Sequence, residues 1–565
     1  MRKSSSEWFV LLSSAFLFSI TGCGGSTADH SLAPLTVTAI TPSQAVQNSA
    51  ALTIKISGSG FGSADQVTFG GKAVTASVVS SSEIDITLPV QDLTISGSFP
   101  IAVTLGEVSA QEEFTVTVSS SSNPSLITLD NTGTTTANAD SYAVSLSPDG
   151  RFVAFSSTAT NLTTDALIAT PNIFLRDTCL GADNTCKPRT LLISAGYGGG
   201  PADGPSGRYT NGDVSTTSVS NSGRYVAFAS EADNLTLSDT NASRDVFVRD
   251  TCLGAQGMCS PQTSLVSANL QGTSAGGLSD NPQMTPNGRY VAFESGAMDL
   301  ANPAGGAALQ VFLRDTCVGA TQGCTSQTSL LSRSATGAPG NGISHSASIS
   351  DDGTLVAFSS RSTNLVSSAS QGFENIFVQP ICTPSCFAPH LSSKAPTGMP
   401  ANGASSQPAI SGDGSHLAFM TLATNILAVS SGNEADVLEF SLCSLGSVCA
   451  NSGLIASSDL PSSPAINSLP QLSMDGTVVV FLAVSASGTQ PTELYARVPC
   501  GTGNGCSPVT TLVSKALNGN PSSINVGLFA LSQSSRLVAF ASADSGFTTL
   551  PTGGAIQLYI TSIQP

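Results

Sequence analysis

The thirteen cysteines are the residues of this 565-residue chain whose type and spacing point most directly to chemistry. Twelve of them form six local pairs: Cys179–Cys186, Cys252–Cys259, Cys317–Cys324, Cys382–Cys386, Cys443–Cys449 and Cys500–Cys506. A disulfide between such close neighbours can join the two arms of a hairpin in an oxidising compartment. Metal binding is the alternative, but the pairs as a set lack a recurring histidine or a second cysteine pair. We predict six disulfides, which leave Cys23 without a partner in the chain.

A second candidate site lies between Asp239 and Asp245, where oxygen-bearing side chains stand at every second position. Calcium takes six to eight oxygen ligands, and this spacing begins to resemble a calcium-binding loop. Asp239, Asn241 and Asp245 are therefore a candidate metal site, and we expect no other cofactor. The corresponding loops of the repeats described below carry Thr164-Asp165 and Ser367-Ser368, so the ligands do not recur. A solvated loop with turn-forming Asp and Asn is the simpler interpretation.

No set of side chains in the sequence marks a catalytic centre. The four histidines, His30, His345, His390 and His416, do not recur with a carboxylate or cysteine at ligand spacing, so we interpret them as structural or surface residues. The segment from Gly272 to Gly276 fits the pattern G-x-S-x-G. A nucleophile elbow needs a strand before this pattern and a helix after it, whereas here it lies in a Gly/Ser-rich loop. We expect no catalytic residue there.

Arg-Asp dipeptides recur at residues 176–177, 249–250 and 314–315. Adjacent residues of a strand point to opposite faces of a sheet, so the two side chains are not expected to pair with each other. We predict that they contact a neighbouring repeat rather than a ligand.

The cysteine pairs belong to a unit that is repeated seven times. A turn followed by a strand that ends in Phe recurs, as in SPDGRFVAF (Ser147–Phe155) and TPNGRYVAF (Thr285–Phe293), and successive phenylalanines are 73, 65, 65, 61, 62 and 59 residues apart. Each unit contains an inner strand, the VAF strand, a third strand such as NIFLRDT and a fourth such as TLLIS. The cysteine pairs fall between the third and fourth strands. Four antiparallel strands per repeat are typical of a β-propeller blade.

The two ends of the repeat region predict a closed ring. The last unit reaches its third strand at Ile556–Ile563, and Ser125–Leu129 has the pattern of the missing fourth strand. We predict that this segment completes the seventh blade, which would leave no open sheet edge. The D-G turn and the VAF strand resemble the WD40-like (PD40) repeats of TolB-type propellers, although the repeat is longer here and carries cysteines. The resemblance implies a seven-bladed TolB-like β-propeller at residues 125–565.

Strands of alternating apolar and polar residues also fill the segment from Pro34 to Val118, which predicts a β-sandwich. Ile40-Thr41-Pro42, the glycine-rich Gly58–Gly62 and Val67–Gly71 resemble IPT/TIG domains. The resemblance implies an immunoglobulin-like module at residues 34–118, commonly a spacer or an interaction domain, before a linker at 119–124. No helix follows the glycines, so we do not expect a nucleotide-binding loop.

The N-terminus carries the pattern of an export signal. Arg2 and Lys3 precede the apolar stretch Trp8–Ile20, which is too short to span a bilayer as a helix. The following Ile20-Thr21-Gly22-Cys23 resembles the lipobox of bacterial lipoprotein signal peptides. The resemblance implies a signal peptide at 1–22, lipidation of Cys23 and a tether at 23–33; Gly24 further implies export to the outer membrane. An ordinary secretory signal is the alternative.

The composition narrows the function classes that remain. Only 10% of residues are charged and the net charge is −17, which argues against nucleic-acid binding and against a polybasic contact with anionic lipid. We predict an all-β, monomeric lipoprotein of the cell envelope, periplasmic or surface-exposed. Its propeller would bind a protein or glycan partner without catalysis, with the IPT/TIG domain as spacer. The alternative is an envelope hydrolase or lyase with a site at the propeller's central opening, because fold alone does not decide function.

Overall fold

The computed structural model describes residues 34–563 with interruptions. The residues outside this description are 1–33, 47–50, 64, 71, 90–92, 94–96, 106–107, 118–122, 166, 168, 183–184, 209–213, 303–304, 321–322, 368–371, 382–388, 428–433, 444–446, 450–452, 459, 461–464, 486–489, 499–508, 534–536 and 564–565. The described residues form β-strands joined by turns, with a short 3₁₀ helix, Ser545–Phe547, and no α-helix. The predicted all-β class is therefore confirmed. No helix in the described part of the chain is long and apolar enough to cross a membrane.

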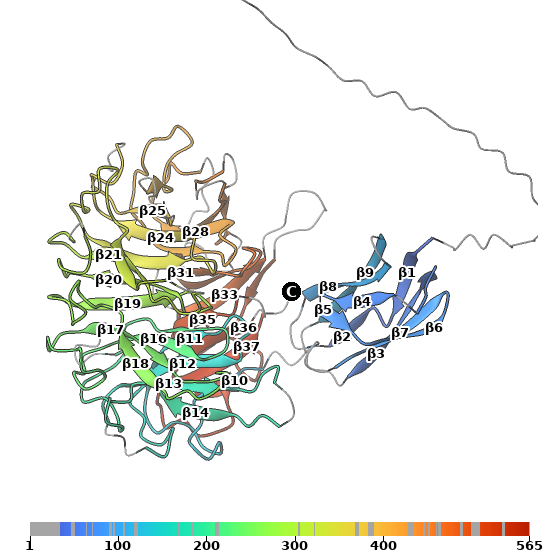
Figure 1. Cartoon of the computed structure of the whole chain (residues 1–565). Helices are drawn as coiled ribbons and strands as arrows, with labels where there is room; N and C mark the ends of the chain where they lie inside the picture. The colour runs from blue at the N-terminus through green and yellow to red at the C-terminus, as the bar shows by residue number, and fades with distance from the viewer. Residues whose placement is uncertain are drawn as a thin grey trace, which may run out of the picture. The chain divides into compact units, whose positions relative to one another are not determined.

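Two sheets make up the N-terminal part, drawn in blue in Figure 1. One has the strand order β1-β3-β7-β6 and the other β2-β9-β8-β4-β5, in which β2 runs parallel to β9. The strands are β1 (Thr36–Thr41), β2 (Gln44–Val46), β3 (Leu52–Ser59), β4 (Gln66–Phe69), β5 (Lys72–Val74), β6 (Ala76–Ser80), β7 (Glu83–Leu88), β8 (Gly97–Leu105) and β9 (Val108–Thr117). Alternate residues of β7 are buried, as a strand with one covered face requires (Ile84, Ile86 and Leu88).

Seven further sheets follow, each of four antiparallel strands. The first three are β11–β14 (Ser141–Leu146, Phe152–Ser157, Asn172–Asp177, Arg189–Leu192), β15–β18 (Ser218–Val219, Tyr225–Ser230, Asp245–Asp250, Gln262–Leu265) and β19–β22 (Ser279–Met284, Tyr290–Ser295, Gln310–Asp315, Gln327–Leu330). The next three are β23–β26 (Ser344–Ile349, Leu355–Ser360, Asn375–Pro380, His390–Leu391), β27–β30 (Ser405–Ile410, His416–Thr421, Asp436–Ser441, Leu454–Ile455) and β31–β34 (Ala465–Leu472, Val479–Ser485, Glu493–Val498, Val509–Leu512). The four-stranded repeat unit matches the prediction (Figure 1).

The last sheet combines the two ends of the repeat region. It contains β35 (Val526–Leu531), β36 (Leu537–Ser542) and β37 (Gln557–Ser562), and its fourth strand is β10 (Ser125–Leu126). In this pairing Ser125 lies opposite Ile560 and Leu126 lies opposite Tyr559. The Ile127 N–H then donates to the Leu558 carbonyl at 2.8 Å, which continues the contact beyond the strand.

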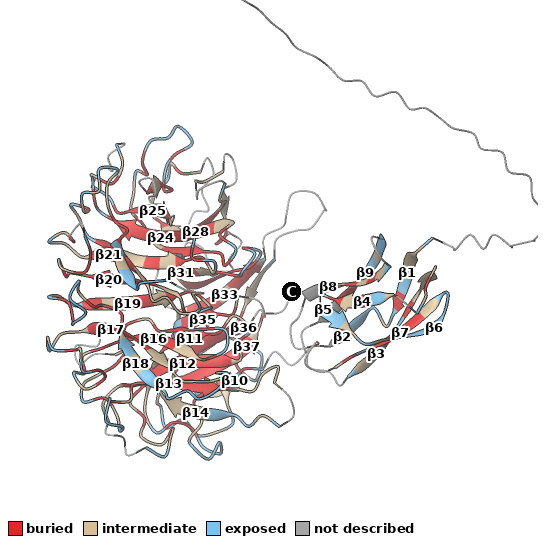
Figure 2. Cartoon of the chain, viewed as in Figure 1, coloured by how far each residue is buried: buried red, intermediate tan, exposed pale blue. Residues whose placement is uncertain are grey.

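The phenylalanine of each VAF motif packs on an aromatic ring of the third strand. The centroids of these pairs are 5.5–6.3 Å apart: Phe155–Phe174, Phe228–Phe247, Phe293–Phe312, Phe358–Phe377, Phe419–Phe440, Phe481–Tyr495 and Phe540–Tyr559. The second and third strands are accordingly the most deeply buried, as the red segments of Figure 2 show. Hydrophobic burial of these rings explains why the VAF motif recurs.

A polar bond also recurs at the first residue of each third strand, where an amide or carboxylate accepts a hydrogen bond from a hydroxyl that follows the fourth strand. The pairs are Asn172–Ser194, Asp245–Ser267, Gln310–Ser332, Asn375–Ser393, Asp436–Ser457, Glu493–Ser514 and, in the last sheet, Gln557–Thr128. Thr128 thus occupies the position that serine holds in the other six sheets. The hydroxyl also accepts the next N–H of the third strand, which fixes the ends of the two strands together.

Successive sheets share apolar clusters. Ala292 and Val311 of one sheet, for example, pack with Val356 and Phe358 of the next. The glycines of the D-G turns make a second contact of this kind, because a Cβ atom on Gly288, whose φ is +81°, would lie 2.6 Å from Cδ2 of Tyr225 in the preceding sheet. These glycines therefore provide both a left-handed turn and room for the neighbouring sheet.

Candidate functional site

Four of the six predicted disulfides are present, each at the turn between a third and a fourth strand. They are Cys179–Cys186, Cys252–Cys259, Cys317–Cys324 and Cys443–Cys449. The pairs Cys382–Cys386 and Cys500–Cys506 and the lipidation candidate Cys23 lie outside the described residues. Three bridges have an aspartate beside them, in the groups Asp177/Cys179/Cys186, Asp250/Cys252/Cys259 and Asp315/Cys317/Cys324. Their sulfur atoms are bonded to each other, so these groups do not offer thiolates to a metal.

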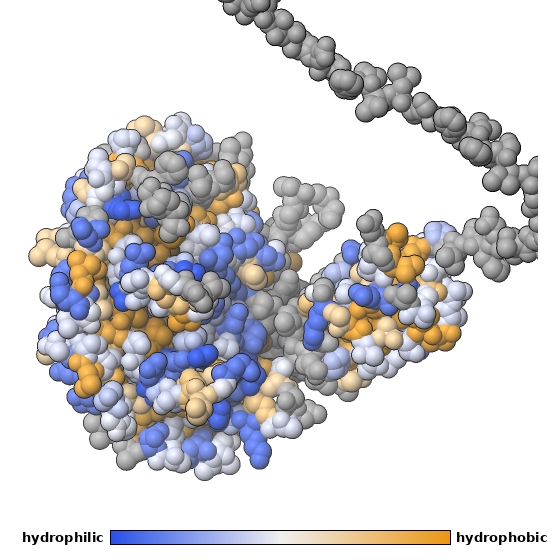
Figure 3. Space-filling view, viewed as in Figure 1, coloured by the Kyte–Doolittle hydropathy of each residue, from blue (hydrophilic) through white to orange (hydrophobic). Residues whose placement is uncertain are grey.

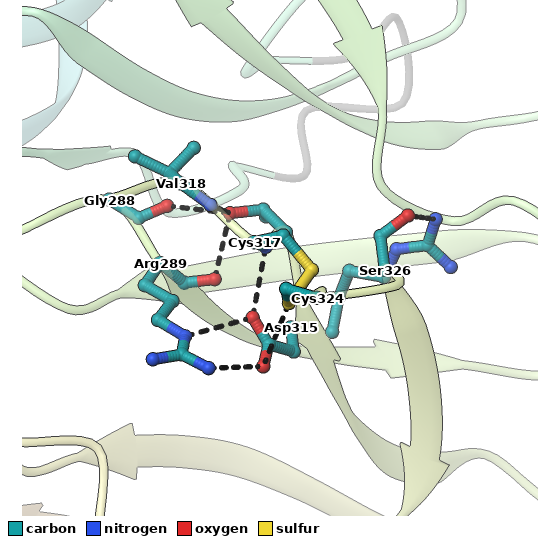
Figure 4. Close-up of a disulfide and its surroundings, with 9 residues drawn as sticks. Gly288, Arg289, Asp315, Cys317, Val318, Cys324 and Ser326 are labelled. Atoms are coloured by element: carbon teal, nitrogen blue, oxygen red, sulfur yellow. Dashed lines mark hydrogen bonds and ion pairs between the residues drawn. A yellow bond between two sulfur atoms is a disulfide. The ribbon is translucent and has the colours of Figure 1, made fainter. Parts of the chain in front are cut away.

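The aspartate beside each of these three bridges is held by an arginine (Figure 4). Asp315 accepts two hydrogen bonds from the guanidinium of Arg289, at 3.1 and 3.0 Å, and a third from the Cys317 N–H at 2.9 Å. The third bond supports Cys317 in a left-handed conformation, with φ of +64°. The same contacts link Arg151 to Asp177 and Arg224 to Asp250.

The Arg-Asp dipeptides were predicted to contact a neighbouring repeat, and for their aspartates this prediction was wrong. Each aspartate pairs with an arginine at the start of the second strand of its own sheet. The arginines of the dipeptides also bond within their own sheet, as when Arg314 Nη1 donates to Thr328 Oγ1 on the fourth strand at 3.0 Å. The third strand is central in its sheet, so it has a strand on either side to supply partners.

The calcium candidate lies in the loop between β16 and β17. Asp239 and Asp245 are 7% and 0% exposed, so the interpretation of this segment as a solvated loop was wrong for its two carboxylates. Burial raises the pKa of Asp239 to about 6 and that of Asp245 to about 7. Asn241 lies between them in sequence and donates from its amide to the Ala275 carbonyl at 2.7 Å. Ser274 of the G-x-S-x-G pattern lies in the facing turn, where its hydroxyl accepts the Thr240 N–H at 3.0 Å.

Two histidines lie beside carboxylates that sequence spacing did not reveal. Nε2 of His345 lies 3.1 Å from Oε1 of Glu374, and Nδ1 of His345 lies 2.9 Å from the hydroxyl of Ser346. Contact with Glu374 raises the pKa of His345. Burial would raise the pKa of Glu374, but His345 and Arg361 outweigh this effect and lower it. His345 belongs to β23 and Glu374 is the residue before β25, so local sequence spacing does not reveal the pair.

His416 shows a looser version of the same arrangement. Its Nε2 lies 4.0 Å from Oε1 of Glu439, which is 3% exposed. Burial raises the pKa of Glu439 to about 7, while the charge of Arg497 acts in the opposite direction. His390 lies at the start of β26, and His30 falls outside the described residues.

The first strands of all seven sheets line one cavity of about 360 Å³. Its polar side chains include the amides of Asn281, Gln283, Gln407, Gln471 and Gln533 and the carboxylates of Glu294 and Asp351, and its lining residues include no Lys, Arg or His. Ser346 also lines the cavity, with φ of +54°, and its N–H donates to Oε1 of Glu294 at 2.7 Å. Such a cavity suits a small polar ligand that is neutral or positively charged.

A second surface feature is a set of exposed apolar side chains on loops of the first three sheets. Tyr197, Leu237, Leu270 and Met298 are 60–76% exposed. Main-chain bonds join these loops from sheet to sheet, because the Tyr197 N–H donates to the Asn234 carbonyl and the Leu270 N–H donates to the Asp299 carbonyl. Hydrophobic and hydrophilic side chains are interspersed over the visible face of these sheets (Figure 3).

Comparison with known proteins identifies an IPT/TIG domain at residues 35–126, where the family model of that name matches. No curated protein matches the chain. Structural matches include TolB from Acinetobacter baumannii (15% identity, TM-score 0.31, 57% of this chain and 60% of that chain) and a TolB-like protein from Agrobacterium tumefaciens (12%, 0.30, 56% and 80%). An auxiliary nutrient binding protein from Bacteroides thetaiotaomicron also matches (11%, 0.27, 80% and 95%). The match to the first of these spans less than two thirds of that protein.

Proposed function

We propose that this protein is a non-catalytic binding module of the cell envelope, in which a closed seven-bladed propeller binds a protein partner and the IPT/TIG domain acts as a spacer. The observation that carries the proposal is the set of exposed apolar side chains on linked loops: Tyr197, Leu237, Leu270 and Met298. Exposed apolar side chains that lie on adjoining loops are typical of protein-interaction sites, and the main-chain bonds join the loop of Tyr197 to that of Leu237 and the loop of Leu270 to that of Met298. Three of the four are aliphatic, which favours a protein over a glycan that stacks on aromatic rings.

Ring closure by the segment Ser125–Thr128 is part of this proposal. Two observations support it: Thr128 takes the role of the recurring serine in the last sheet, and β10 pairs with β37. A shared apolar cluster also contains Val153 and Phe155 of the first sheet together with Ala539 and Leu558 of the last. A ring in which every sheet packs between two others has no open face or edge.

The proposal also includes anchoring of the chain to the outer membrane through a lipid on Cys23. The lipobox-like Ile20-Thr21-Gly22-Cys23 supports it, and so do the disulfides, which require an oxidising compartment such as the envelope. Metabolic labelling with an alkyne fatty acid should label the wild-type chain, whereas Cys23→Ser should abolish the label. Labelling that persists in Cys23→Ser would contradict the assignment.

The binding role can be tested by photo-crosslinking in intact cells. A photoreactive amino acid at Leu270 should give a discrete crosslinked product with one envelope protein, and the double change Leu237→Ser/Met298→Ser should weaken that product. Val509 is 49% exposed on a fourth strand and provides a matched control position that should give no such product. Equal crosslinking from both positions, or none from Leu270, would contradict the proposed surface.

An envelope hydrolase remains the second candidate, and one observation favours it. Ser346, His345 and Glu374 form a hydroxyl–imidazole–carboxylate series, and Ser346 lines the central cavity. Such a series can activate a hydroxyl for attack on an acyl group. A fluorophosphonate probe should label the wild-type chain and not Ser346→Ala if this function holds. If the probe does not label the wild-type chain and Leu270 gives the crosslinked product, the hydrolase is excluded and the binding role is supported.

A further inference from the structure

The loop between β16 and β17 is packed against the segment that follows β18. The Thr240 N–H donates to the Ser274 hydroxyl at 3.0 Å, and Asn241 Nδ2 donates to the Ala275 carbonyl at 2.7 Å. The Ala275 N–H in turn bonds to the Ser267 carbonyl at 3.2 Å, and Ser267 is the hydroxyl partner of Asp245. Asp239, Asn241 and Asp245 are therefore arranged around one short stretch of the neighbouring segment.

Asp245 occupies a position that an amide fills in four of the seven sheets. In the first sheet Asn172 receives the serine hydroxyl on its oxygen and donates from Nδ2 to the Thr170 carbonyl at 2.9 Å. An ionised carboxylate cannot make the second of these bonds. Oδ2 of Asp245 is accordingly buried, with the Asn241 amide nearby but no donor in close hydrogen-bonding geometry among the described residues.

Asp239 indicates more strongly than Asp245 that this loop binds a cation. Asp239 is 7% exposed, and the donors near its carboxylate are the Ser274 hydroxyl and the Asn241 N–H, neither of them in close hydrogen-bonding geometry with it. Asp233 and Asp203 add further negative charge nearby. A buried carboxylate with few hydrogen-bond donors is unfavourable unless a cation or a proton compensates its charge.

We propose that Asp239, Asn241 and Asp245 form a calcium-binding site. Three buried carboxylate oxygens with few donors come from Asp239 in the loop and from Asp245 at the first residue of β17. The amide oxygen of Asn241 accepts the Ser243 N–H at 3.0 Å and has a second lone pair to offer a hard cation. Calcium accepts such irregular oxygen sets and completes its six to eight ligands with main-chain carbonyls and water, whereas magnesium requires near-ideal octahedral geometry.

The first sheet provides an internal contrast. In the sequence, the positions six and four residues before Asn172 are Ala166 and Ile168, whereas the same positions before Asp245 are Asp239 and Asn241. The first repeat therefore has two apolar residues in place of two oxygen-bearing ones, and its third strand begins with the amide of Asn172 in place of the carboxylate of Asp245. This difference indicates that Asp239, Asn241 and Asp245 are particular to the second sheet and that the fold of the repeat does not require them.

The test uses the full-length protein in mild detergent, treated with chelator and then titrated with calcium or magnesium. Calcium should raise the Tm by about 2 °C or more and give a calorimetric binding curve, with a much weaker effect of magnesium. Asp239→Ala and Asp245→Asn should each weaken calcium binding at least tenfold. Asp245→Asn recreates the amide of Asn172 and should fold normally, so a loss of binding there is not a folding defect.

Asp165→Asn is the matched control, because it removes one charge from an exposed residue in the equivalent loop of the first sheet and should leave the calcium affinity within about twofold. A wild-type chain with the same Tm in calcium and in chelator and no binding heat would overturn the proposal. Unchanged calcium affinity in both Asp239→Ala and Asp245→Asn would also overturn it.

Discussion

Arg289 and Asp315 form a two-point ion pair at the ends of neighbouring strands of one sheet. Nε of Arg289 lies 3.1 Å from Oδ1 and Nη2 lies 3.0 Å from Oδ2 of the aspartate. The same carboxylate accepts the Cys317 N–H, so it joins the turn before the second strand to the turn that carries the disulfide (Figure 4).

The first prediction concerns this contact. Asp315→Ala should lower the free energy of unfolding by on the order of 1–3 kcal/mol, because it leaves a guanidinium and a main-chain donor without their acceptor. It should also speed the reduction of Cys317–Cys324, which alkylation and mass spectrometry can follow against Cys443–Cys449 in the same sample. Arg289→Gln keeps the bond from Asp315 to Cys317 and should have the smaller effect. Equal reduction rates in Asp315→Ala and wild type would contradict this role.

The sequence contained a signal for the ion pair that spacing within one strand did not reveal. Arginine follows the glycine of the turn in the same three repeats in which aspartate ends the third strand. In the fourth repeat both change together, to Thr354 and Pro380. The disulfides could be predicted because both cysteines lie in one turn, and the strands could be predicted from their alternation. The burial of Asp239 and the contact between His345 and Glu374 depend on segments that meet only after the sheets assemble.

A second prediction concerns closure of the last sheet. Ile127 is 3% exposed and belongs to the cluster that contains Leu558 and Ile560. Ile127→Ala should destabilise the propeller region by about 2–5 kcal/mol, because it removes buried methylene groups and leaves a cavity. Val509→Ala removes the same type of side chain from an exposed site and should change stability by less than about 0.5 kcal/mol. Chemical denaturation followed by intrinsic fluorescence measures both; equal stabilities would exclude Ser125–Thr128 as a structural part of the last sheet.

A third prediction concerns the IPT/TIG domain. A Cβ atom on Gly58 would meet the Thr36 carbonyl and would lie 2.6 Å from the Phe61 ring, whereas one on Gly62 would meet nothing within 4 Å. Gly58→Ala should therefore destabilise this domain by about 2 kcal/mol or more through overpacking. Gly62→Ala should be close to neutral. Limited proteolysis within residues 34–118 measures the difference, and equal resistance of the two variants would contradict the close approach of β1 and β3.

The last prediction concerns pH and Glu493, which is the buried first residue of the third strand in the sixth sheet. Burial raises its pKa from an ordinary value near 4.5 to about 7, and its carboxylate receives the Ser514 hydroxyl. Between these two pH values the folded state holds a proton that the unfolded state has released. The contribution of Glu493 to stability is therefore greatest below about pH 4.5 and is lost as the pH rises to about 7.

Glu493→Gln should remove this dependence, because glutamine supplies a permanent donor. Gln310 already shows the geometry in the third sheet, where its Nε2 donates to the Gly340 carbonyl at 3.0 Å. At pH 8 the variant should be more stable than the wild type by on the order of 1–3 kcal/mol, and at pH 4.5 the two should be nearly equal. The reverse change, Gln310→Glu, should introduce the same loss of stability between these pH values. Parallel stability–pH curves for Glu493→Gln and wild type would mean that Glu493 is ionised in the folded protein across the whole range. The Ser514 hydroxyl and the Ser522 N–H would then be sufficient to stabilise a buried carboxylate at this position.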